Sequence, residues 1–529
     1  MTPYLSLPQR NLCQKSIFDR LLQPISEGAL YSVKYRARRS MIMMNIRHTA
    51  SKASRFSCAR WTCSMKERAR NDTIFALSTA QGRAGVGIIR VSGPDATQCV
   101  DALSKQTKQS ALAPRIATFR KLYHPVTKEH LDDAVVLHFP EPKSFTGEDT
   151  IEFQVHGSSA VISGVLQALS TVPRYRIAEP GEFTERAFEN QKMNLMQVEA
   201  LADLLSAETE SQRSQALRQL SGRNGETFEK WQQSLITFLA YTEAMIDFGD
   251  DEDDVTDSSY AKMVERAKDL QSRMKYHLND GRRGELLRNG IQVAIIGPPN
   301  AGKSSLLNYL AQRPAAIVSS IAGTTRDIVR VPLNLKGYAV VLCDTAGIRE
   351  TDNVIEKIGV ERARECAEEA DIRLLMVDGE LFQSEWEDLG KVENANTIIV
   401  CNKSDLIDDA STLEDLRRSI ASRSSISAER IQFISCLKGS GIDALIETIG
   451  ESVQAKVSSP DASIITRERH RQHLENCTAY LQEFLANPYE SEFAAEHLRR
   501  AVDCIGRILG RVDVEQVLDV IFQEFCIGK

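Results

Sequence analysis

The segment from Gly297 to Ser304 is rich in glycine and ends in a lysine and a serine, which fits the pattern G-x-x-x-x-G-K-[ST]. In this pattern the backbone N–H groups of the loop surround phosphate oxygens, and the lysine adds a positive charge. We therefore expect Lys303, a candidate catalytic residue, to contact the β- and γ-phosphates of a nucleotide. The Ser304 hydroxyl is expected to bind Mg²⁺. An ordinary glycine turn between a strand and a helix also fits the pattern, so segments downstream must decide.

Three further segments follow in the order expected of a GTPase. The segment from Asp344 to Gly347 supplies a carboxylate that can hold Mg²⁺ through water and a glycine amide for the γ-phosphate. Asp405 ends the sequence Asn-Lys-Ser-Asp, where a carboxylate can accept hydrogen bonds from the ring N–H and the amine of guanine. Adenine lacks this pair of donors, so such a site selects GTP. The expected GTP contacts are Asn300, Ala301, Gly302, Lys303, Ser304, Ser305, Ser319, Ser320, Ile321, Ala322, Gly323, Thr324, Thr325, Asp344, Thr345, Ala346, Gly347, Asn402, Lys403, Asp405, Ser435, Cys436 and Leu437.

The residue that orients the attacking water is not evident from these motifs. Many GTPases carry a glutamine directly after the glycine of Asp-x-x-Gly, but this chain has Ile348. No arginine finger can be assigned either, although Arg349 is near. In the hydroxyl-rich segment 319–327, Thr325 is the expected second Mg²⁺ ligand, and the remaining oxygens could hold a further cation.

Short apolar runs stand directly before these motifs and indicate the strands that position them. The runs are 291–296, 339–342, 397–401 and 431–434, and helical spacing follows the first of them from Ser305 to Leu310. In open α/β sheets, ligands bind beyond the carboxyl ends of the strands. The pattern therefore predicts a P-loop GTPase domain over residues 289–452.

The N-terminal 70 residues differ in charge from the rest of the chain. They hold 14 Lys and Arg against three acids, a balance of +11, whereas the whole chain carries −7, so the remainder carries −18. A basic, serine-rich and acid-poor leader is typical of a mitochondrial transit peptide. A disordered basic arm that binds nucleic acid remains the alternative. No run approaches the roughly 20 apolar residues that span a bilayer, so no stable membrane insertion is expected.

At 529 residues the chain should form about three or four domains. Strand-like runs broken by Gly and Pro predict a mixed α/β domain over 72–189, and apolar residues at helical spacing predict helices over 190–288 and 456–529. We expect the two helical segments to pack together, with the GTPase domain inserted between them. The seven acids within 247–257 indicate a solvated loop. The eleven cysteines show no C-x-x-C pair, which is typical of a reducing compartment.

Several segments, taken together, resemble the MnmE (TrmE) family of tRNA-modification GTPases over about residues 72–529, in what looks like a fungal mitochondrial form. They are DTIFALSTAQGRAGVGIIRVSG, SFTGEDTIEF, PGEFTERAFEN, GPPNAGKSSLLN, IAGTTRD, DTAGIRE, IEKIGVERA, AAEHLRRA and the terminal FCIGK. The resemblance implies a multidomain α/β plus all-α chain: a folate-binding-like N-terminal α+β domain, a discontinuous helical domain and an inserted Ras-like GTPase domain.

The resemblance also implies partners and cofactors. Proteins of this family are homodimers whose N-terminal domains pair and bind a tetrahydrofolate derivative, the 5,10-methylene or 5-formyl form. With an FAD-dependent partner of the MnmG/GidA type they modify carbon 5 of the wobble uridine (U34) of certain tRNAs. A mitochondrial member would do so in the matrix. By its match to the family's motifs, the resemblance implies that Arg90, Glu152 and Lys192 contact the folate. It also implies that K⁺ is bound by Asn300, Ser319, Ile321 and Thr324. Glu356 would be a catalytic residue that orients the attacking water.

This chain departs from the family pattern at a few positions. Ser319 stands where a threonine is common, Asn194 replaces an aspartate, Gln81 replaces a proline, and Cys436 replaces the usual alanine of the base-binding loop. The changes at Gln81 and Asn194 bear on the N-terminal site more than on the GTP site.

Cys526 lies four residues from the end of the chain, after a predicted amphipathic helix. A free nucleophile and a packed structural thiol both remain open, whereas a prenylation box is disfavoured because Lys529 is not a usual terminal residue. A ribosome-assembly GTPase and a dynamin-like membrane remodeller are the rival functions. They are disfavoured because neither an RNA-binding appendage nor a membrane anchor is recognisable.

Overall fold

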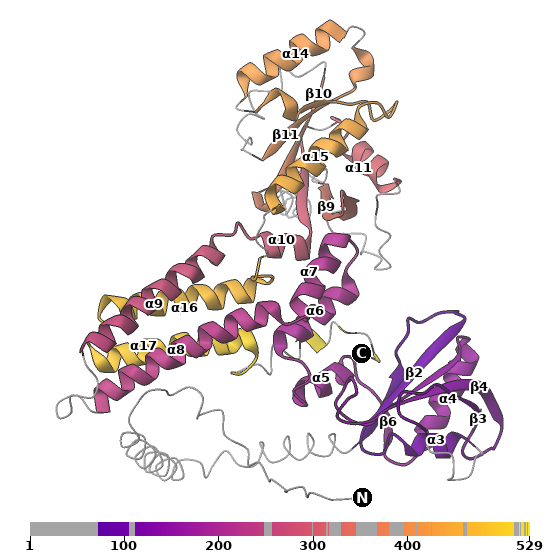
Figure 1. The fold of residues 1–529 in the computed structure, drawn as a ribbon. Helices are drawn as coiled ribbons and strands as arrows, with labels where there is room; N and C mark the ends of the chain where they lie inside the picture. The colour runs from indigo at the N-terminus through magenta and orange to yellow at the C-terminus, as the bar shows by residue number, and fades with distance from the viewer. Residues whose placement is uncertain are drawn as a thin grey trace, which may run out of the picture. The chain divides into compact units, whose positions relative to one another are not determined.

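The computed structural model is drawn in Figure 1. It describes residues 72–104, 112–247, 257–298, 300–313, 316, 330–344, 368–379, 396–407, 410–424, 426–458, 463–512, 518, 520–522, 525 and 527–528.

The N-terminal domain is a six-stranded sheet of order β3-β4-β5-β2-β1-β6, antiparallel except for the parallel pair β1–β6. Alternate residues of β2 are buried, so one face of the sheet packs against helix α4 through Val165 and Leu169. The elements are β1 (Thr73–Leu77), β2 (Val86–Ser92), α3 (Gln98–Leu103), β3 (Thr118–Tyr123), β4 (His130–Phe139), β5 (Thr150–His156), α4 (Ser159–Ser170) and β6 (Tyr175–Ile177).

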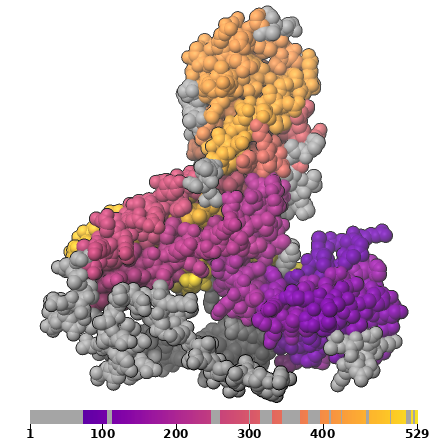
Figure 2. Space-filling model, in the orientation of Figure 1, coloured from indigo at the N-terminus to yellow at the C-terminus, as the bar shows by residue number. Residues whose placement is uncertain are grey.

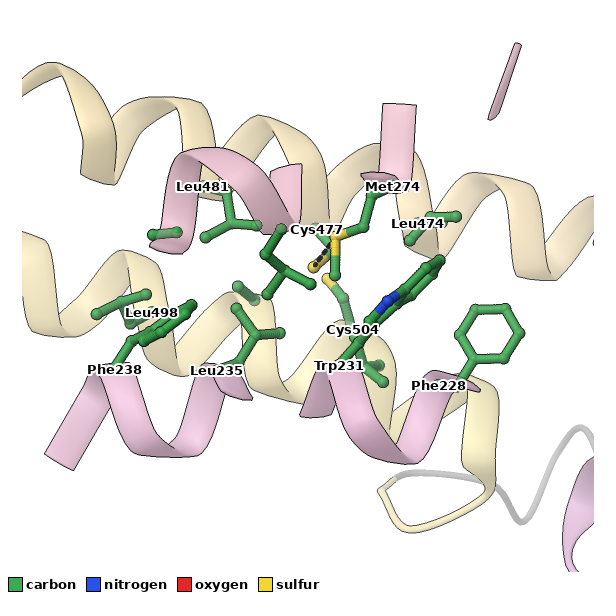
Figure 3. Close-up of a cluster of buried hydrophobic side chains, with 14 of the residues drawn as sticks. Phe228, Trp231, Leu235, Phe238, Met274, Leu474, Cys477, Leu481, Leu498 and Cys504 are labelled. Carbon is green, nitrogen blue, oxygen red and sulfur yellow. Dashed lines mark hydrogen bonds between the residues drawn. The ribbon is translucent and has the colours of Figure 1, made fainter. Parts of the chain in front are cut away.

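The helices before and after the GTPase domain share one hydrophobic core, which confirms the prediction that they pack together. Figure 3 shows Trp231 and Leu235 of α8 pointing toward Cys477 and Leu481 of α16. Capping boxes at Asn194 and Thr209 begin α6 and α7. The helices are α5 (Glu182–Glu189), α6 (Leu195–Ser206), α7 (Glu210–Leu220), α8 (Arg223–Asp247), α9 (Asp257–Leu278), α10 (Arg283–Asn289), α16 (Glu468–Ala486) and α17 (Ser491–Leu509).

Buried ion pairs hold together the two points where the chain leaves and re-enters the helical domain. Arg471 at the start of α16 contacts Asp280 and Glu285, each at 3.0 Å, beside the start of α10. All three side chains are buried. Since removing one member of a buried pair leaves an uncompensated charge, we expect this cluster to fix both crossovers.

The GTPase domain has a six-stranded sheet of order β12-β11-β10-β7-β9-β8, parallel except for the antiparallel edge pair β8–β9. All residues of β11 are buried, as expected for a central strand covered on both faces. The elements are β7 (Ile291–Ile296), α11 (Lys303–Ala311), β8 (Arg330–Leu335), β9 (Tyr338–Asp344), β10 (Ile372–Asp378), β11 (Thr397–Asn402), η3 (Ser404–Leu406), α14 (Ala410–Arg423), η4 (Ala428–Arg430), β12 (Ile431–Phe433) and α15 (Ile442–Val457). The four strands expected before the nucleotide motifs are thus confirmed.

Candidate functional site

The nucleotide motifs meet at one edge of the GTPase sheet. Because β7, β9, β11 and β12 run in the same direction, their carboxyl ends lie side by side. The loop after β7 holds Asn300 to Lys303, β9 ends at Asp344, β11 ends at Asn402, and Ser435 follows β12. The structure therefore brings together the described members of all four predicted segments.

Two glycines allow the P-loop to approach neighbouring strands. Gly297 has φ +157°, and a Cβ there would lie 2.0 Å from the carbonyl oxygen of Met376. Gly302 precedes α11 in a left-handed conformation, and its Cβ would lie 2.2 Å from Asn402 Nδ2. The N-cap residue Gly302 has no side chain with which to cap the first turn of α11. Its N–H groups are therefore suited to bind phosphate oxygens, as expected of a helix that begins at a phosphate site.

Lys303 is nine-tenths buried at the start of α11. Its ammonium donates hydrogen bonds to the carbonyl oxygens of Gly297 and Pro298, both at 2.8 Å. Ser304 and Ser305 follow it and are exposed. The loop thus carries a positive charge beside two hydroxyls, which are the groups that a nucleotide phosphate and Mg²⁺ require.

Asn402 joins three of the nucleotide loops. Its side chain is buried, and its Nδ2 donates to the carbonyl oxygen of Ala301 at 2.8 Å, while its Oδ1 accepts from the backbone N–H of Cys436 at 3.1 Å. The P-loop and the base-binding loop are therefore held to the end of β11 by one amide group.

Asp405, the carboxylate expected to select guanine, lies next to the hydroxyl of Ser435. Hydrogen bonding from Ser435, which is fully buried, lowers the pKa of Asp405. Burial, helped by the nearby charge of Asp405, raises the pKa of the Cys436 thiol to about 11. Asp405 is thus an acceptor at neutral pH, as a guanine site requires, and Cys436 remains a neutral thiol.

Many predicted site residues lie outside the described part of the chain. These are Ser319, Ser320, Ile321, Ala322, Gly323, Thr324, Thr325, Thr345, Ala346, Gly347, Glu356 and Cys526; of Asp344 only the backbone is described.

The three residues expected to contact folate border one loop of the N-terminal domain. Arg90 and Glu152 are direct neighbours on β2 and β5, and the guanidinium Nε donates to the carboxylate at 3.0 Å. The guanidinium also lies 5.3 Å from the ring centre of Phe145. Lys192 donates to the carbonyl oxygen of Pro142 at 2.8 Å. The loop from Pro142 to Phe145 therefore contacts both Arg90 and Lys192.

The described residues around Cys526 contact the N-terminal domain. Ile527 pairs with Pro180 in an isolated β-bridge, and Ser78 Oγ donates to the carbonyl oxygen of Gly528 at 3.0 Å. Phe525 is buried beside Leu195 of α6. The tail is thus held between the helical domain and the N-terminal sheet.

Comparison with known families agrees with this division of the chain. A family described as the MnmE helical domain matches residues 195–526, and one described as the GTP-binding protein TrmE N-terminus matches residues 73–192. The chain belongs to the MnmE (TrmE) family. The first match spans the whole GTPase domain, as expected when a domain is inserted into a helical one.

Relatives in the MnmE family match over nearly their full length. The tRNA modification GTPase MnmE of Parvibaculum lavamentivorans is 46% identical over 87% of this chain and 100% of its own length. The mitochondrial 5-taurinomethyluridine-[tRNA] synthase subunit GTPB3 is 44% identical in Danio rerio, over 87% of this chain and 93% of that protein. In Homo sapiens it is 42% identical, over 91% of this chain and 98% of that protein. The similarity thus covers every domain described above.

The sequence analysis of this MnmE-family chain missed Asp378. This residue ends β10 between β7 and β11, and its carboxylate lies 2.6 Å from the Lys403 ammonium. The pair fixes Lys403 beside the expected guanine site. A signal was present, because Asp378 follows the run Ile372–Val377, which is apolar except for Arg373, as the other motifs follow their strands. Among the helices that the structure describes, none has both the length and the apolar character to cross a membrane.

Proposed function

We propose that this chain is a K⁺-stimulated GTPase that acts in mitochondrial tRNA modification at carbon 5 of the wobble uridine (U34). The observation that carries the proposal is the 42–46% identity, over 93–100% of their length, to proteins named for tRNA modification. The geometry of the GTPase domain supports it, since the P-loop, Asn402 and Asp405 meet at one sheet edge.

In the proposed hydrolysis, water attacks the γ-phosphorus of GTP, the bond to the β-phosphate oxygen breaks, and GDP and phosphate leave. Lys303 and the N-terminus of α11 neutralise charge on the phosphates. Asp405 selects guanine, and Glu356 orients the water.

Two cations belong to this proposal. Ser304 and Thr325 would hold Mg²⁺, which neutralises phosphate charge. The exposed Ser304 hydroxyl next to the buried Lys303 fits this role. Asn300, Ser319, Ile321 and Thr324 would hold K⁺, which takes the place of an arginine finger. Asn300 fits because its backbone adopts φ +64° beside Gly302 and its side chain is exposed.

The N-terminal domain would bind the folate that supplies one carbon, the 5,10-methylene- or 5-formyl-tetrahydrofolate. The support is chemical: Arg90 and Lys192 offer cations to a carboxylate, Glu152 offers an acceptor, and Phe145 offers a ring face. The chain would act as a homodimer through this domain, together with an FAD-dependent partner of the MnmG/GidA type and tRNA.

Cys526 would act near the folate. Its neighbours Phe525 and Ile527 contact the helical domain and the N-terminal domain respectively, so the tail has a defined place. Cys526→Ser removes the thiolate while keeping the size of the side chain. The variant is expected to hydrolyse GTP normally and to lose modification, whereas full modification would leave Cys526 as a packing residue.

The proposed compartment is the mitochondrial matrix. Its support is the basic leader of residues 1–70 and the relatives named as mitochondrial. Cleavage of this leader before Asn71 is expected, and N-terminal sequencing of the protein from isolated mitochondria tests it.

Reconstitution tests the proposed function. The purified chain, its FAD-dependent partner, a wobble-uridine tRNA transcript, 5,10-methylene-tetrahydrofolate, an amine donor and GTP are combined in K⁺ buffer. Mass spectrometry of the digested tRNA should show a mass increase on U34 with GTP and none with a non-hydrolysable analogue. Modification without any nucleotide would contradict the role of the GTPase domain.

A further inference from the structure

A hollow of about 840 Å³ lies between α8 and α9, away from the nucleotide motifs. Figure 2 shows that both helices reach the surface of the face in view, α8 in magenta and α9 in pink. The hollow is lined by Thr227, Lys230, Trp231, Ser234, Thr237 and Phe238 of α8 and by Arg266, Asp269, Leu270, Ser272, Arg273, Tyr276 and His277 of α9. Nothing in the proposed chemistry uses these residues.

The polar lining forms two matched stripes. On α8, Thr227, Lys230, Ser234 and Thr237 follow the spacing of three, four and three residues that places side chains on one face of a helix. Arg266, Asp269, Arg273 and Tyr276 repeat this spacing on α9.

The two helices run in opposite directions. Trp231 lies 5.6 Å from His277 between ring centres, and Thr242 lies 3.5 Å from the Tyr260 hydroxyl. The end of the groove near Lys230 therefore adjoins Arg273 and Tyr276, while Arg266 lies toward the other end.

The groove is basic, and two of its cations have no anionic partner within the described residues. Lys230 and Arg266 are exposed and make no side-chain ion pair there, whereas Arg273 pairs with Asp269, the one carboxylate in the lining. Several other exposed arginines of this domain are paired, as Arg500 is with Glu496 and Arg213 is with Glu210. Among the described residues, Lys230 and Arg266 thus remain positive charges without an ion-pair partner.

An aromatic side chain, that of Tyr276, stands at the Lys230 end of the groove. Tyr276 is 63% exposed, and its ring meets His277 edge-on at 5.5 Å. The buried Trp231 forms the floor beneath His277. A ring held against another ring and open to solvent on its remaining side is suited to stacking on a planar group.

We infer that this groove binds the RNA backbone of the tRNA substrate, with an unpaired base stacked on Tyr276. Lysine, arginine and hydroxyl side chains are the groups that contact phosphate and ribose, and unstacked bases pack on aromatic side chains. The inference rests on the proposed function for the identity of the RNA. The Ser234 and Thr237 hydroxyls donate to the carbonyl oxygens of Lys230 and Gln233, so they can accept hydrogen bonds from ribose hydroxyls. An acidic protein segment would suit the two cations, but it would leave these acceptors and the exposed ring unused.

The first test compares charge reversals by fluorescence anisotropy with a labelled wobble-uridine tRNA transcript over a range of KCl concentrations. The groove variant carries Lys230→Glu and Arg266→Glu. The matched control carries Arg223→Glu and Lys262→Glu, which reverse one exposed cation on each of the same helices outside the groove. Loss of two phosphate contacts should reduce the slope of log affinity against log salt by about 1.4, taking about 0.7 for each contact.

The second test isolates stacking. Tyr276→Ala should weaken tRNA binding about fivefold or more, and Tyr276→Phe, which keeps the ring, should bind as the wild type does. All variants should retain GTP hydrolysis and thermal stability.

Equal tRNA affinity and salt slope in the groove and control variants would overturn the inference, as would a wild-type chain that, with its partner protein, binds no tRNA. Loss of partner-protein association with unchanged tRNA binding would also overturn it and would assign the groove to a protein. Failure of the reconstituted modification by the wild type would instead count against the proposed function, because binding and modification are measured separately.

Discussion

Asn402→Ala removes a side chain that connects the P-loop to the base-binding loop. In the wild type the Asn402 amide donates to Ala301 O at 2.8 Å and accepts from Cys436 N at 3.1 Å. Alanine would leave both backbone groups without these partners. Asn402 is 4% exposed and Ala301 is 1% exposed, so water replaces the lost bonds poorly.

The expected size follows from these two bonds. An unsatisfied buried donor or acceptor costs about 1–3 kcal/mol. Cys436 is only half-buried, so its N–H should cost about 1 kcal/mol and the pair about 2–4 kcal/mol in all. At 1.4 kcal/mol for each factor of ten, a nucleotide that must restore the loop geometry would bind about 30-fold to 700-fold more weakly. GTP and GDP should lose affinity equally, because the amide holds the P-loop and the base-binding loop, which are expected to contact groups that both nucleotides carry.

Equilibrium titration with fluorescent GTP and GDP analogues measures this effect. Gln432→Ala is the matched control, because the Gln432 amide on the neighbouring strand donates two hydrogen bonds of 2.9 Å, to Glu429 O and Thr448 Oγ1, away from the nucleotide motifs. It should leave affinity within about threefold. If Asn402→Ala bound both nucleotides within threefold of the wild type, the connecting role assigned to Asn402 would be refuted. A loss of affinity for GTP alone would indicate that Asn402 acts on binding of the γ-phosphate instead.

Four further predictions concern the rest of the molecule. GTP turnover should rise about a hundredfold when K⁺ replaces Na⁺, since a cation held by Asn300 would neutralise transition-state charge; equal rates in a phosphate-release assay would exclude this. Lys192→Ala should abolish folate binding in calorimetry without changing GTP turnover, and unchanged binding would remove Lys192 from the site. Gly528 has φ +102°, and a Cβ there would lie 2.1 Å from the carbonyl oxygen of Leu77, so Gly528→Ala should detach the tail from the N-terminal domain. The variant should show lower modification in the reconstituted assay with normal GTP turnover. Full modification would show that the tail contact is dispensable. Burial lowers the pKa of His470, although a neighbouring carboxylate opposes this shift. As the pH falls, the imidazole is therefore protonated in the unfolded chain before it is protonated in the folded chain. The free energy of unfolding should thus fall as the pH drops below about 6.5. Urea titrations at pH 7.5 and 5.5 should show this fall, and His470→Gln should reduce it; an identical pH dependence in the variant would exclude His470 as its source.

The GTPase sheet was predictable because each nucleotide motif follows a short apolar run. The run Ile291–Ile296 is β7 with the same bounds, and Thr397–Cys401 forms β11, which extends to Asn402. A buried parallel strand consists of apolar residues on both faces, so it is visible without any partner. Strand β8 was missed because Arg330, Pro332 and the exposed Asn334 interrupt its pattern, and pairing with β9 at the sheet edge decides its conformation.

The contacts within the site could not be predicted, because they join residues far apart in the sequence. Asn402 was recognised as part of a base-binding motif, but its bond to Ala301 depends on how β11 lies relative to β7. The same holds for Ser78, whose bond to Gly528 spans 450 positions. The prediction for Glu356 and that for the cation ligands on segment 319–324 stay predictions.

The central claim is that this chain uses GTP hydrolysis to modify wobble uridine in mitochondrial tRNA. Mass spectrometry of U34 nucleosides from mitochondrial tRNA of a deletion strain tests it most directly, with the strain complemented by the wild type or by Lys303→Ala. We predict unmodified U34 in the deletion strain, full restoration by the wild type, and no restoration by Lys303→Ala despite normal expression. Normal U34 modification in the deletion strain, or restoration by Lys303→Ala, would contradict the claim.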